Sequence, residues 1–403
     1  MNDSHHRGNS SSGGDIEFIA ITATLYVVVI IASFLGNITI CVVIFSTRSL
    51  RRSVNSIFIL SLAVSDLTTT CLVMPFDLEH LISGSKWHHG EVMCNIWTTT
   101  YLLAVPTSIL SLLALTVYRY RLLQDPLDIY KSSPLMTRRR ALMVVCCLWT
   151  YSMLFSLVPL FGWKTYPRSV IGGKCYFNGS WIYSVLSSLI NFVMPVITAS
   201  FLNCRMFCLA IRLSRKTLRA VEHSGKNRHG SSFSTTIQNC SPYKNENAET
   251  PLKSKPCNRR YNRQIVDDRQ LYQSAQREDF LLKKLQKRNS RAAKTTILIV
   301  FSFVLCWFPH TLWSITYSFC KECFINVSYS LLSYMSTFFL MLGYLNSALN
   351  PILYSFRTPE FQKAVTRSLA KRFASSKEHS GRKSSHPRLS LTKSTSVDRE
   401  TRL

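Results

Sequence analysis

Seven long apolar stretches, each of about 20 or more residues, divide this chain of 403 residues. A helix needs about 20 apolar residues to cross the roughly 30 Å hydrocarbon core of a bilayer. We therefore predict seven membrane spans, at residues 18–45, 55–80, 92–123, 140–163, 181–213, 292–319 and 328–354. The predicted fold class is an all-α membrane protein, a seven-transmembrane helix bundle that occupies residues 18–372.

The basic residues predict the orientation of the bundle. Arg48, Arg51 and Arg52 follow the first span, and Lys131 and residues 138–140 add further positive charge between the third and fourth spans. Because basic loops stay in the cytosol, the N-terminus is predicted to lie outside the cell. The first span is also too long for a cleaved signal sequence.

The segments outside the spans are polar. We expect an extracellular N-terminal tail at residues 1–17, a disordered third cytosolic loop at 214–280 and a disordered cytosolic tail at 373–403, because these segments contain few large apolar residues. Most of the formal net charge of +27 falls in the cytosolic segments. We interpret it as positive charge that faces the anionic inner leaflet, and we expect no nucleic-acid partner. Glycosylation sequons on the outer side begin at Asn2, Asn9, Asn178 and Asn326.

Four of the 13 cysteines fall on the predicted outer side, where the environment is oxidising. Cys94 opens the third span and Cys175 lies in the loop before the fifth, so a bridge between them would tie that loop across the outer mouth. Cys320 and Cys323 are close enough to close a small ring. A Cys-x-x-Cys can also be a redox or zinc element, but without further ligands nearby we favour a structural disulfide.

Polar and proline residues recur at fixed places in the spans. In order they are Gly36-Asn37, the segment 62–67 with Asp66, Arg119-Tyr120, Trp149, Pro195, Cys306-Trp307-Phe308-Pro309 and Asn350-Pro351-Ile352-Leu353-Tyr354. This ordered set resembles the rhodopsin-like (class A) G-protein-coupled receptors. The resemblance implies a multi-pass receptor of the plasma membrane that transmits an extracellular small-molecule signal to a heterotrimeric G protein, with arrestin as a further partner.

The same resemblance implies a short amphipathic helix after the seventh span, starting near Phe361. Neither an enzyme nor a transporter is indicated. The sequence shows no nucleophile, metal cluster or phosphate loop, and it lacks the inverted repeats and broken helices of transporters.

Asp66 places a carboxylate within an apolar span, which is costly unless the group is paired or hydrated. By resemblance, Ser108, Asn346, Ser347 and Asn350 surround it, and together they would hold an allosteric sodium ion. A purely structural polar cluster is the alternative. No other cofactor is expected.

The outer half of the bundle is similar to the monoamine receptors, in which adjacent serines of span five bind ring hydroxyls and an aspartate of span three binds the amine. The aspartate position here is Tyr101, and no acid replaces it between Trp97 and Val105. The predicted ligand-binding residues are Trp97, Tyr101, Val105, Ser187, Ser188, Asn191, Trp307, His310, Thr311 and Tyr344. Two alternatives are open for Asp77. It supplies a displaced counter-charge, in which case the ligand is an amine, or it is a solvated rim residue, in which case the ligand is a non-amine.

Arg119 is, by resemblance, the contact for the G protein. In the family an adjacent acid and a glutamate of span six restrain it, but here those positions are Tyr118 and Asn289. The predicted coupling and switch residues are Tyr118, Arg119, Tyr120, Asn203, Asn289 and Tyr354. Loss of two carboxylates predicts high basal signalling. The alternative is a weakly coupling receptor that acts through arrestin or receptor partners.

The tail combines Ser and Thr with basic residues, which suits phosphorylation and arrestin recruitment. Its last residues, with Thr401 and Leu403, resemble a class I PDZ ligand that would add as a strand to a PDZ-domain partner.

Overall fold

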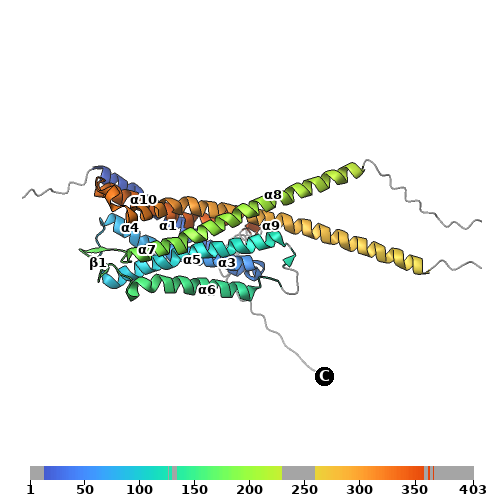
Figure 1. The fold of residues 1–403 in the computed structure, drawn as a ribbon, viewed down its shortest axis with the longest axis horizontal. Helices are drawn as coiled ribbons and strands as arrows, with labels where there is room; N and C mark the ends of the chain where they lie inside the picture. Colours follow the sequence, from blue (N-terminus) through green and yellow to red (C-terminus); the bar gives the residue numbers. More distant parts are fainter. Residues whose placement is uncertain are drawn as a thin grey trace, which may run out of the picture.

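The computed structural model describes residues 13–125, 127–128, 134–228, 259–357, 362–363 and 366. Long helices lie side by side in an elongated bundle (Figure 1). Its main helices are α1 (Gly13–Ser46), α3 (Val54–Leu72), α4 (Met74–Ile82), α5 (Gly90–Gln124), α6 (Arg138–Leu157), α7 (Trp181–Ser188), α8 (Met194–Arg228), α9 (Arg259–Phe319) and α10 (Tyr329–Arg357). The shorter elements are α2 (Arg48–Arg52), η2 (Val158–Phe161), η3 (Leu189–Val193), η4 (Lys321–Phe324), β1 (Val170–Ile171) and β2 (Lys174–Cys175).

Six helical segments of the described chain are long and apolar enough to cross a membrane. Three of them are composite, since α4 continues α3, η2 continues α6, and the π-helical turn η3 joins α7 to α8. The helix α10 is not among the six, but it packs between α9 and α1 as the seventh rod of the bundle. The predicted seven-helix fold class is therefore confirmed.

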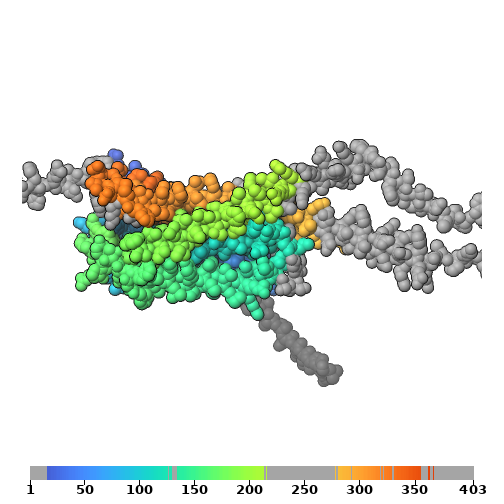
Figure 2. Space-filling model, viewed as in Figure 1, coloured from blue at the N-terminus to red at the C-terminus, as the bar shows by residue number. Residues whose placement is uncertain are grey.

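The helix α5 occupies the centre of the bundle, where it packs against α3, α6, α8 and α9. Around it, α6 and α8 cover much of the face seen in Figure 2. Large apolar side chains point outward, among them Leu35 at 59%, Leu154 at 65% and Phe201 at 60% exposure. Such an outer surface fits a lipid environment, because lipid tails are as apolar as these side chains.

Local sequence explains several helix starts and contacts. The hydroxyls of Thr137 and Ser180 accept hydrogen bonds from the third backbone N–H beyond them and so cap α6 and α7. Gly36 brings α1 close to α10, since a Cβ there would lie 2.7 Å from the side chain of Pro351. Any larger residue at position 36 would force these two helices apart.

The structure differs from the prediction in the third cytosolic loop. The helix α8 runs on to Arg228 and α9 begins at Arg259, so helix covers both ends of the segment 214–280 that we predicted to be disordered. These ends are rich in Arg and Gln, which favour helix once a span has nucleated it. Residues 229–258 lie outside the described residues.

The tails are described only in small part. Residues 362–363 and 366 are helical, and the Thr366 hydroxyl donates to the Gln362 carbonyl at 2.9 Å. The rest of the predicted helix after the seventh span, including Phe361, lies outside the described residues. The same holds for residues 1–12, the cytosolic tail 373–403 and the terminal residues Thr401 and Leu403.

Candidate functional site

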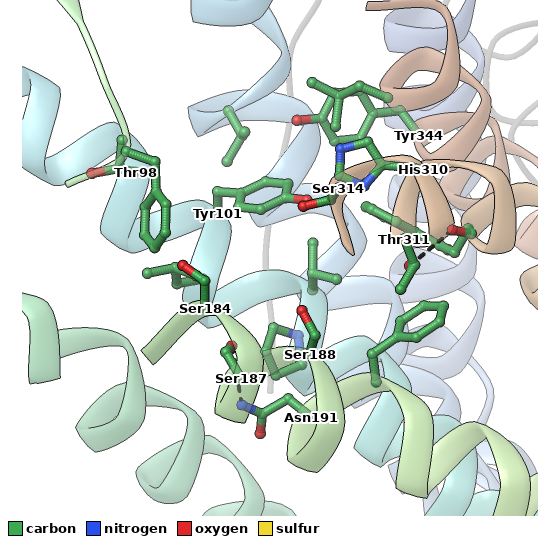
Figure 3. Close-up of a pocket in the computed structure, with 18 of the residues that line it drawn as sticks. Thr98, Tyr101, Ser184, Ser187, Ser188, Asn191, His310, Thr311, Ser314 and Tyr344 are labelled. Carbon is green, nitrogen blue, oxygen red and sulfur yellow. Dashed lines mark hydrogen bonds between the residues drawn. The ribbon is translucent and has the colours of Figure 1, made fainter. Parts of the chain in front are cut away.

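A cavity of about 410 Å³ opens in the outer half of the bundle between α4, α5, α7, α9 and α10. All of the predicted ligand-binding residues line it, namely Trp97, Tyr101, Val105, Ser187, Ser188, Asn191, Trp307, His310, Thr311 and Tyr344. Figure 3 shows Tyr344 and His310 on one side of the cavity and Ser187, Ser188 and Asn191 on the other. The tertiary structure thus brings residues from four separate spans to one place.

Asp77 also lines this cavity. It is half-buried, and its Oδ2 accepts a hydrogen bond of 2.7 Å from the hydroxyl of Tyr344, which is 1% exposed. The interpretation of Asp77 as a solvated rim residue is therefore wrong. The helix breaks at Val73 and restarts at Met74. Pro75 has no N–H to satisfy and so fits the first turn of α4, which carries Asp77 into the cavity wall.

Sequence reasoning also missed Thr98, Ser184 and Ser314, which line the cavity beside the predicted residues. Helical spacing could have found Ser184, because it lies one turn before Ser187 and Ser188 on the same face of α7. The signal for Thr98 was similar, since it directly follows Trp97 and precedes Tyr101 by three residues.

Trp307 lines the cavity within a cluster of aromatic rings. Its ring lies 6.2 Å from that of Tyr344 in an edge-on arrangement, 5.9 Å from His310 and 6.5 Å from Tyr101. Gly343 makes this packing possible, since a Cβ there would come within 3.0 Å of the indole. A ligand in the cavity would therefore contact Trp307, a side chain of α9 that also packs against α10.

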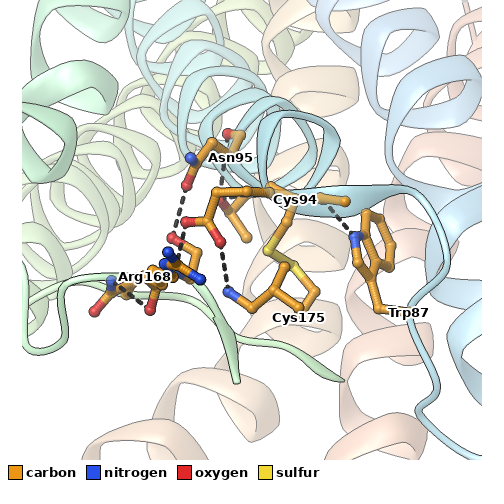
Figure 4. The surroundings of a disulfide bond; sticks show 11 residues. Trp87, Cys94, Asn95, Arg168 and Cys175 are labelled. Carbon is orange, nitrogen blue, oxygen red and sulfur yellow. Dashed lines mark hydrogen bonds between the residues drawn. A yellow bond between two sulfur atoms is a disulfide. The ribbon is translucent and has the colours of Figure 1, made fainter. Parts of the chain in front are cut away.

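The outer mouth of the cavity is covered by the loop that carries β1 and β2. A disulfide joins Cys94 to Cys175, with the two Cα atoms 5.7 Å apart (Figure 4). The carboxylate of Glu91 accepts hydrogen bonds from the backbone N–H groups of Ser169 at 2.6 Å and Val170 at 3.0 Å. The loop is thus fixed to the start of α5 at two places.

The second predicted disulfide, Cys320–Cys323, is also present and closes a small ring over the first turn of η4. Its two Cα atoms lie 5.3 Å apart.

Asn178 differs from the other glycosylation candidates. It is 7% exposed, and its Oδ1 accepts from the N–H groups of Thr165 and Tyr166 at 3.2 and 2.8 Å. Its Nδ2 donates to the carbonyls of Tyr166 at 2.7 Å and Arg168 at 3.2 Å. A glycan on Nδ2 would remove one of these donors from a buried site, so the geometry opposes the prediction for Asn178.

The remaining sequons carry no such conflict. Asn326 is exposed, whereas Asn2 and Asn9 lie outside the described residues.

Asp66 lies deeper in the bundle at 1% exposure. Its carboxylate accepts hydrogen bonds from Ser347 at 2.9 Å, Asn350 at 2.9 Å and Ser108 at 3.5 Å. Asn346 is buried nearby in sequence on α10, and its Oδ1 and that of Asn350 have no hydrogen-bond partner within the described residues. A hard cation such as sodium takes oxygen ligands of this kind, so the donor set fits the predicted ion.

At the cytosolic end, Arg119 is 4% exposed and joins three helices. Its Nε donates to Oδ1 of Asn55 on α3 at 3.0 Å, and its guanidinium also donates to the hydroxyl of Thr296 on α9. Neither partner was predicted. Thr296 lies seven residues, two helical turns, after Asn289, so helical periodicity held a signal for it.

Asn289 makes a separate bridge between the same helices. Its Nδ2 donates to the backbone carbonyl of Leu122 at 2.9 Å, so α9 is tied to α5 a second time. The described contacts of Arg119 and Asn289 are thus all made to neutral groups.

The other predicted switch residues have different surroundings. Tyr118 is 8% exposed with its ring 6.0 Å from Phe58, and the Tyr120 hydroxyl accepts from Gln124 at 3.0 Å. Asn203 and Tyr354 are both buried, but the described residues offer no hydrogen-bond partner to the side-chain amide of Asn203 or to the hydroxyl of Tyr354. The structure therefore does not join these two residues.

Comparison with known proteins gives the family. Residues 36–354 match the model of the 7 transmembrane receptor (rhodopsin family). The chain is 26% identical to a tyramine receptor of Caenorhabditis elegans, over 88% of this chain and 84% of the relative. It is 29% identical to the octopamine receptor beta-2R of Chilo suppressalis, over 91% and 85% of the two chains. Identity to the alpha-1A adrenergic receptor of Bos taurus is 31%, over 83% of this chain and 64% of the relative.

These relatives favour signalling through G proteins over the weakly coupling alternative. The family match begins at Gly36, within the first span, and ends at Tyr354, at the end of the seventh. The chain belongs to the rhodopsin family of seven-transmembrane receptors and is a G-protein-coupled receptor of the plasma membrane.

Proposed function

We propose that this receptor is activated by a protonated small-molecule amine, and that Asp77 supplies the counter-charge in place of the missing acid at Tyr101. The proposal depends above all on one observation: Asp77 is the single carboxylate among the described residues that line the cavity. A buried ammonium needs a charged partner, and a phenol such as Tyr101 cannot supply one at neutral pH. The names of the relatives, which are receptors for tyramine and octopamine, agree with an amine.

Tyr344 supports this role of Asp77. Its hydroxyl donates to Oδ2 and leaves Oδ1 for the ligand. The aromatic rings of Trp97, Tyr101 and Trp307 complete a wall that suits a cation, because the face of an aromatic ring attracts positive charge.

The test is a panel of tyramine, octopamine and dopamine applied to cells that express the receptor, with second-messenger readouts. Asp77→Asn is expected to lower amine potency more than about 100-fold, because removal of one partner of a buried ion pair costs several kcal/mol. Glu79→Gln is the matched control: this acid lies in the same helix but pairs with His89 at 2.8 Å outside the cavity. Tyr101→Asp is expected to restore an amine response to Asp77→Asn. An amine response that survives Asp77→Asn would contradict the proposal, and failure of both the native receptor and Tyr101→Asp would indicate a non-amine ligand.

We further propose that the Asp66 cluster holds an allosteric sodium ion. The unpartnered oxygens of Asn346 and Asn350 support this role, because buried acceptors without partners are costly and a cation would satisfy them. Bound sodium would favour the inactive state by neutralising Asp66.

For the coupling end, we propose that basal signalling is higher than in a receptor with the two usual acids, and that the hydrogen bonds of Arg119 still restrain it in part. The described partners of Arg119, which are Asn55 and Thr296, are neutral, and hydrogen bonds to neutral groups are weaker than those between two charged groups. Arrestin and a PDZ-domain protein remain proposed partners of the cytosolic tail, on the basis of its Ser and Thr content and of Thr401 and Leu403.

A further inference from the structure

A group of arginines gathers where the first and second cytosolic loops meet. All of them are exposed, and they belong to two short stretches of the chain: Arg48, Arg51 and Arg52 of α2, and Arg138, Arg139 and Arg140 in the first turn of α6. The guanidinium of Arg138 donates a hydrogen bond to the backbone carbonyl of Arg51 and so joins the two stretches. We call these six residues the arginine patch.

The arginine patch borders the lipid-facing surface of the bundle. Phe45, three residues before the patch on α1, and Met143, three residues after it on α6, are both exposed apolar side chains. Arg51 extends back toward α1, since its guanidinium lies 3.5 Å from the carbonyl of Phe45. Arginines at the end of an apolar span extend their charged groups to the level of the lipid headgroups. The patch therefore lies where the headgroups of the inner leaflet meet the protein.

No acidic side chain pairs with the arginine patch in the part of the chain that the structure describes. The one ion pair among the described residues joins His89 to Glu79 at the outer end of the bundle. The first turn of α6 contains no acid, although positive charge at the N-terminus of a helix opposes the helix dipole. Three arginines at this position lower the stability of the helix unless an anion lies beside them.

The side chains of the patch are suited to bind phosphate. A guanidinium binds a phosphate group through two parallel N–H donors, which the ammonium of lysine does not offer. Arg48, Arg52 and Arg139 make no side-chain hydrogen bond to another described residue, so their donors are available to a ligand. A phosphate monoester carries between one and two negative charges at neutral pH. A headgroup with several such phosphates matches six arginines better than the single net charge of phosphatidylserine does.

We propose that the arginine patch binds the headgroup of an inositol phospholipid of the inner leaflet that carries more than one phosphate, and that the acyl chains of this lipid lie against the exposed apolar side chains of α1 and α6. A lipid is favoured over a phosphorylated peptide because the patch borders the lipid-facing surface. The site is separate from the ligand cavity, so the proposal does not depend on the proposed amine function.

The test is native mass spectrometry of the purified full-length receptor in detergent, with a phosphatidylinositol bisphosphate or phosphatidylserine added at equal concentration. The native receptor is expected to retain the bisphosphate lipid at least about tenfold more than phosphatidylserine, because the additional phosphates form charge-assisted hydrogen bonds. The double variant Arg52→Gln/Arg139→Gln is expected to weaken retention of the bisphosphate lipid by about tenfold or more, since each arginine near an anionic headgroup contributes to binding. Retention that is unchanged in this variant would overturn the proposal.

A second double variant separates phosphate recognition from charge. Arg52→Lys/Arg139→Lys keeps both charges but removes the paired donors, so it is expected to retain the lipid less well than the native receptor and better than the Gln variant. Thermal unfolding without added lipid is expected to be the same in all three proteins, because neither side chain makes a described hydrogen bond within the protein. A lower unfolding temperature in the variants, together with equal loss of both lipids, would indicate a structural role and would contradict the proposal.

Arg212→Gln/Arg215→Gln is the matched control. It removes the same charge from exposed positions at the cytosolic end of α8, outside the arginine patch, and is expected to leave retention of the bisphosphate lipid unchanged. Equal loss in this control, or equal retention of the two lipids by the native receptor, would mean unspecific attraction to positive charge and would refute a specific site.

Two soluble competitors distinguish the lipid from other phosphate compounds. Inositol trisphosphate carries the phosphates without acyl chains, so it is expected to displace the lipid only at a concentration at least about tenfold higher than that of the lipid, because it lacks the apolar contacts. A tail peptide phosphorylated at Ser384 and Ser385 is expected not to displace it. Displacement by either compound at the concentration of the lipid would overturn the assignment of the patch to a lipid.

Discussion

Tyr344 of α10 donates a hydrogen bond of 2.7 Å to the carboxylate of Asp77 on α4, which joins two spans across the wall of the ligand cavity. The tyrosine is buried, and its ring also packs edge-on against Trp307 at 6.2 Å and Tyr26 at 6.2 Å. This arrangement couples the proposed amine site directly to the aromatic cluster on α9. Because the hydroxyl and the ring of Tyr344 make different contacts, mutation to Phe tests the contribution of the hydroxyl alone.

The first prediction concerns that hydroxyl. Tyr344→Phe keeps the ring but removes a hydrogen bond to a charged group, which contributes about 1.5 kcal/mol. We expect roughly tenfold lower potency for amine agonists in concentration–response measurements. Tyr334→Phe is the control, because Tyr334 packs on Phe18 outside the cavity. Unchanged potency in Tyr344→Phe would separate this tyrosine from the function of Asp77.

The second prediction concerns the restraint on Arg119. Thr296→Val preserves the shape of the side chain but removes the hydroxyl that accepts from the guanidinium. The inactive state should lose about 1.5 kcal/mol, so ligand-free second-messenger signalling should rise several-fold. Thr295→Val is a close control, since Thr295 is equally buried but donates to the carbonyl of Arg291 within its own helix. Equal basal signalling in the two variants would show that the Thr296 contact does not restrain the receptor.

The third prediction concerns sodium. Asp66→Asn retains the size of the side chain but removes the charge that would attract the ion. Replacement of sodium by a bulky organic cation should change agonist affinity in the native receptor and have no effect in the variant. Radioligand competition in the two salts measures this difference. A sodium effect that persists in Asp66→Asn would leave the cluster with a structural role alone.

The fourth prediction concerns glycosylation of the outer loop. Asn178→Gln should not change the mass lost on glycosidase treatment, because the native amide is buried and both its oxygen and its nitrogen are engaged. It should lower surface expression, since the longer amide misplaces four hydrogen bonds. Asn326→Gln, at an exposed sequon, should reduce the mass lost on glycosidase treatment and should not lower surface expression. Loss of one glycan in Asn178→Gln would refute this interpretation.

The fifth prediction compares the two disulfides. In the loop-entropy model, a bridge across 81 residues contributes roughly 4 to 5 kcal/mol and a bridge across 3 residues roughly 1.5 kcal/mol. Cys175→Ser should therefore reduce thermal stability and surface expression much more than Cys323→Ser. Heating of the detergent-solubilised receptor, followed by a folding assay, gives the comparison. Similar losses would show that strain or local packing, rather than loop closure, determines the contribution.

Much of the bundle was predictable because its signals are local. Span lengths follow from runs of apolar residues, and the expected cavity positions of Trp97, Ser187 and Tyr344 follow from the resemblance to the monoamine receptors. Each of these residues indeed lies on the cavity. That Asp66 needs polar partners was predictable from its place in an apolar span, whereas the identity of those partners followed from the family resemblance.

The sequence by itself determined that this chain forms a membrane bundle, that it carries the ordered motifs of a receptor and that the usual acids are missing at Tyr101, Tyr118 and Asn289. Only the tertiary structure decided what stands in their place. Asp77 faces the cavity because the helix breaks at Val73, and Arg119 reaches Asn55 and Thr296 because α3, α5 and α9 converge at the cytosolic end. These partners are 64 and 177 residues from Arg119 in the chain. No local pattern encodes contacts of that kind, because they depend on how rigid helices pack rather than on which residues are neighbours.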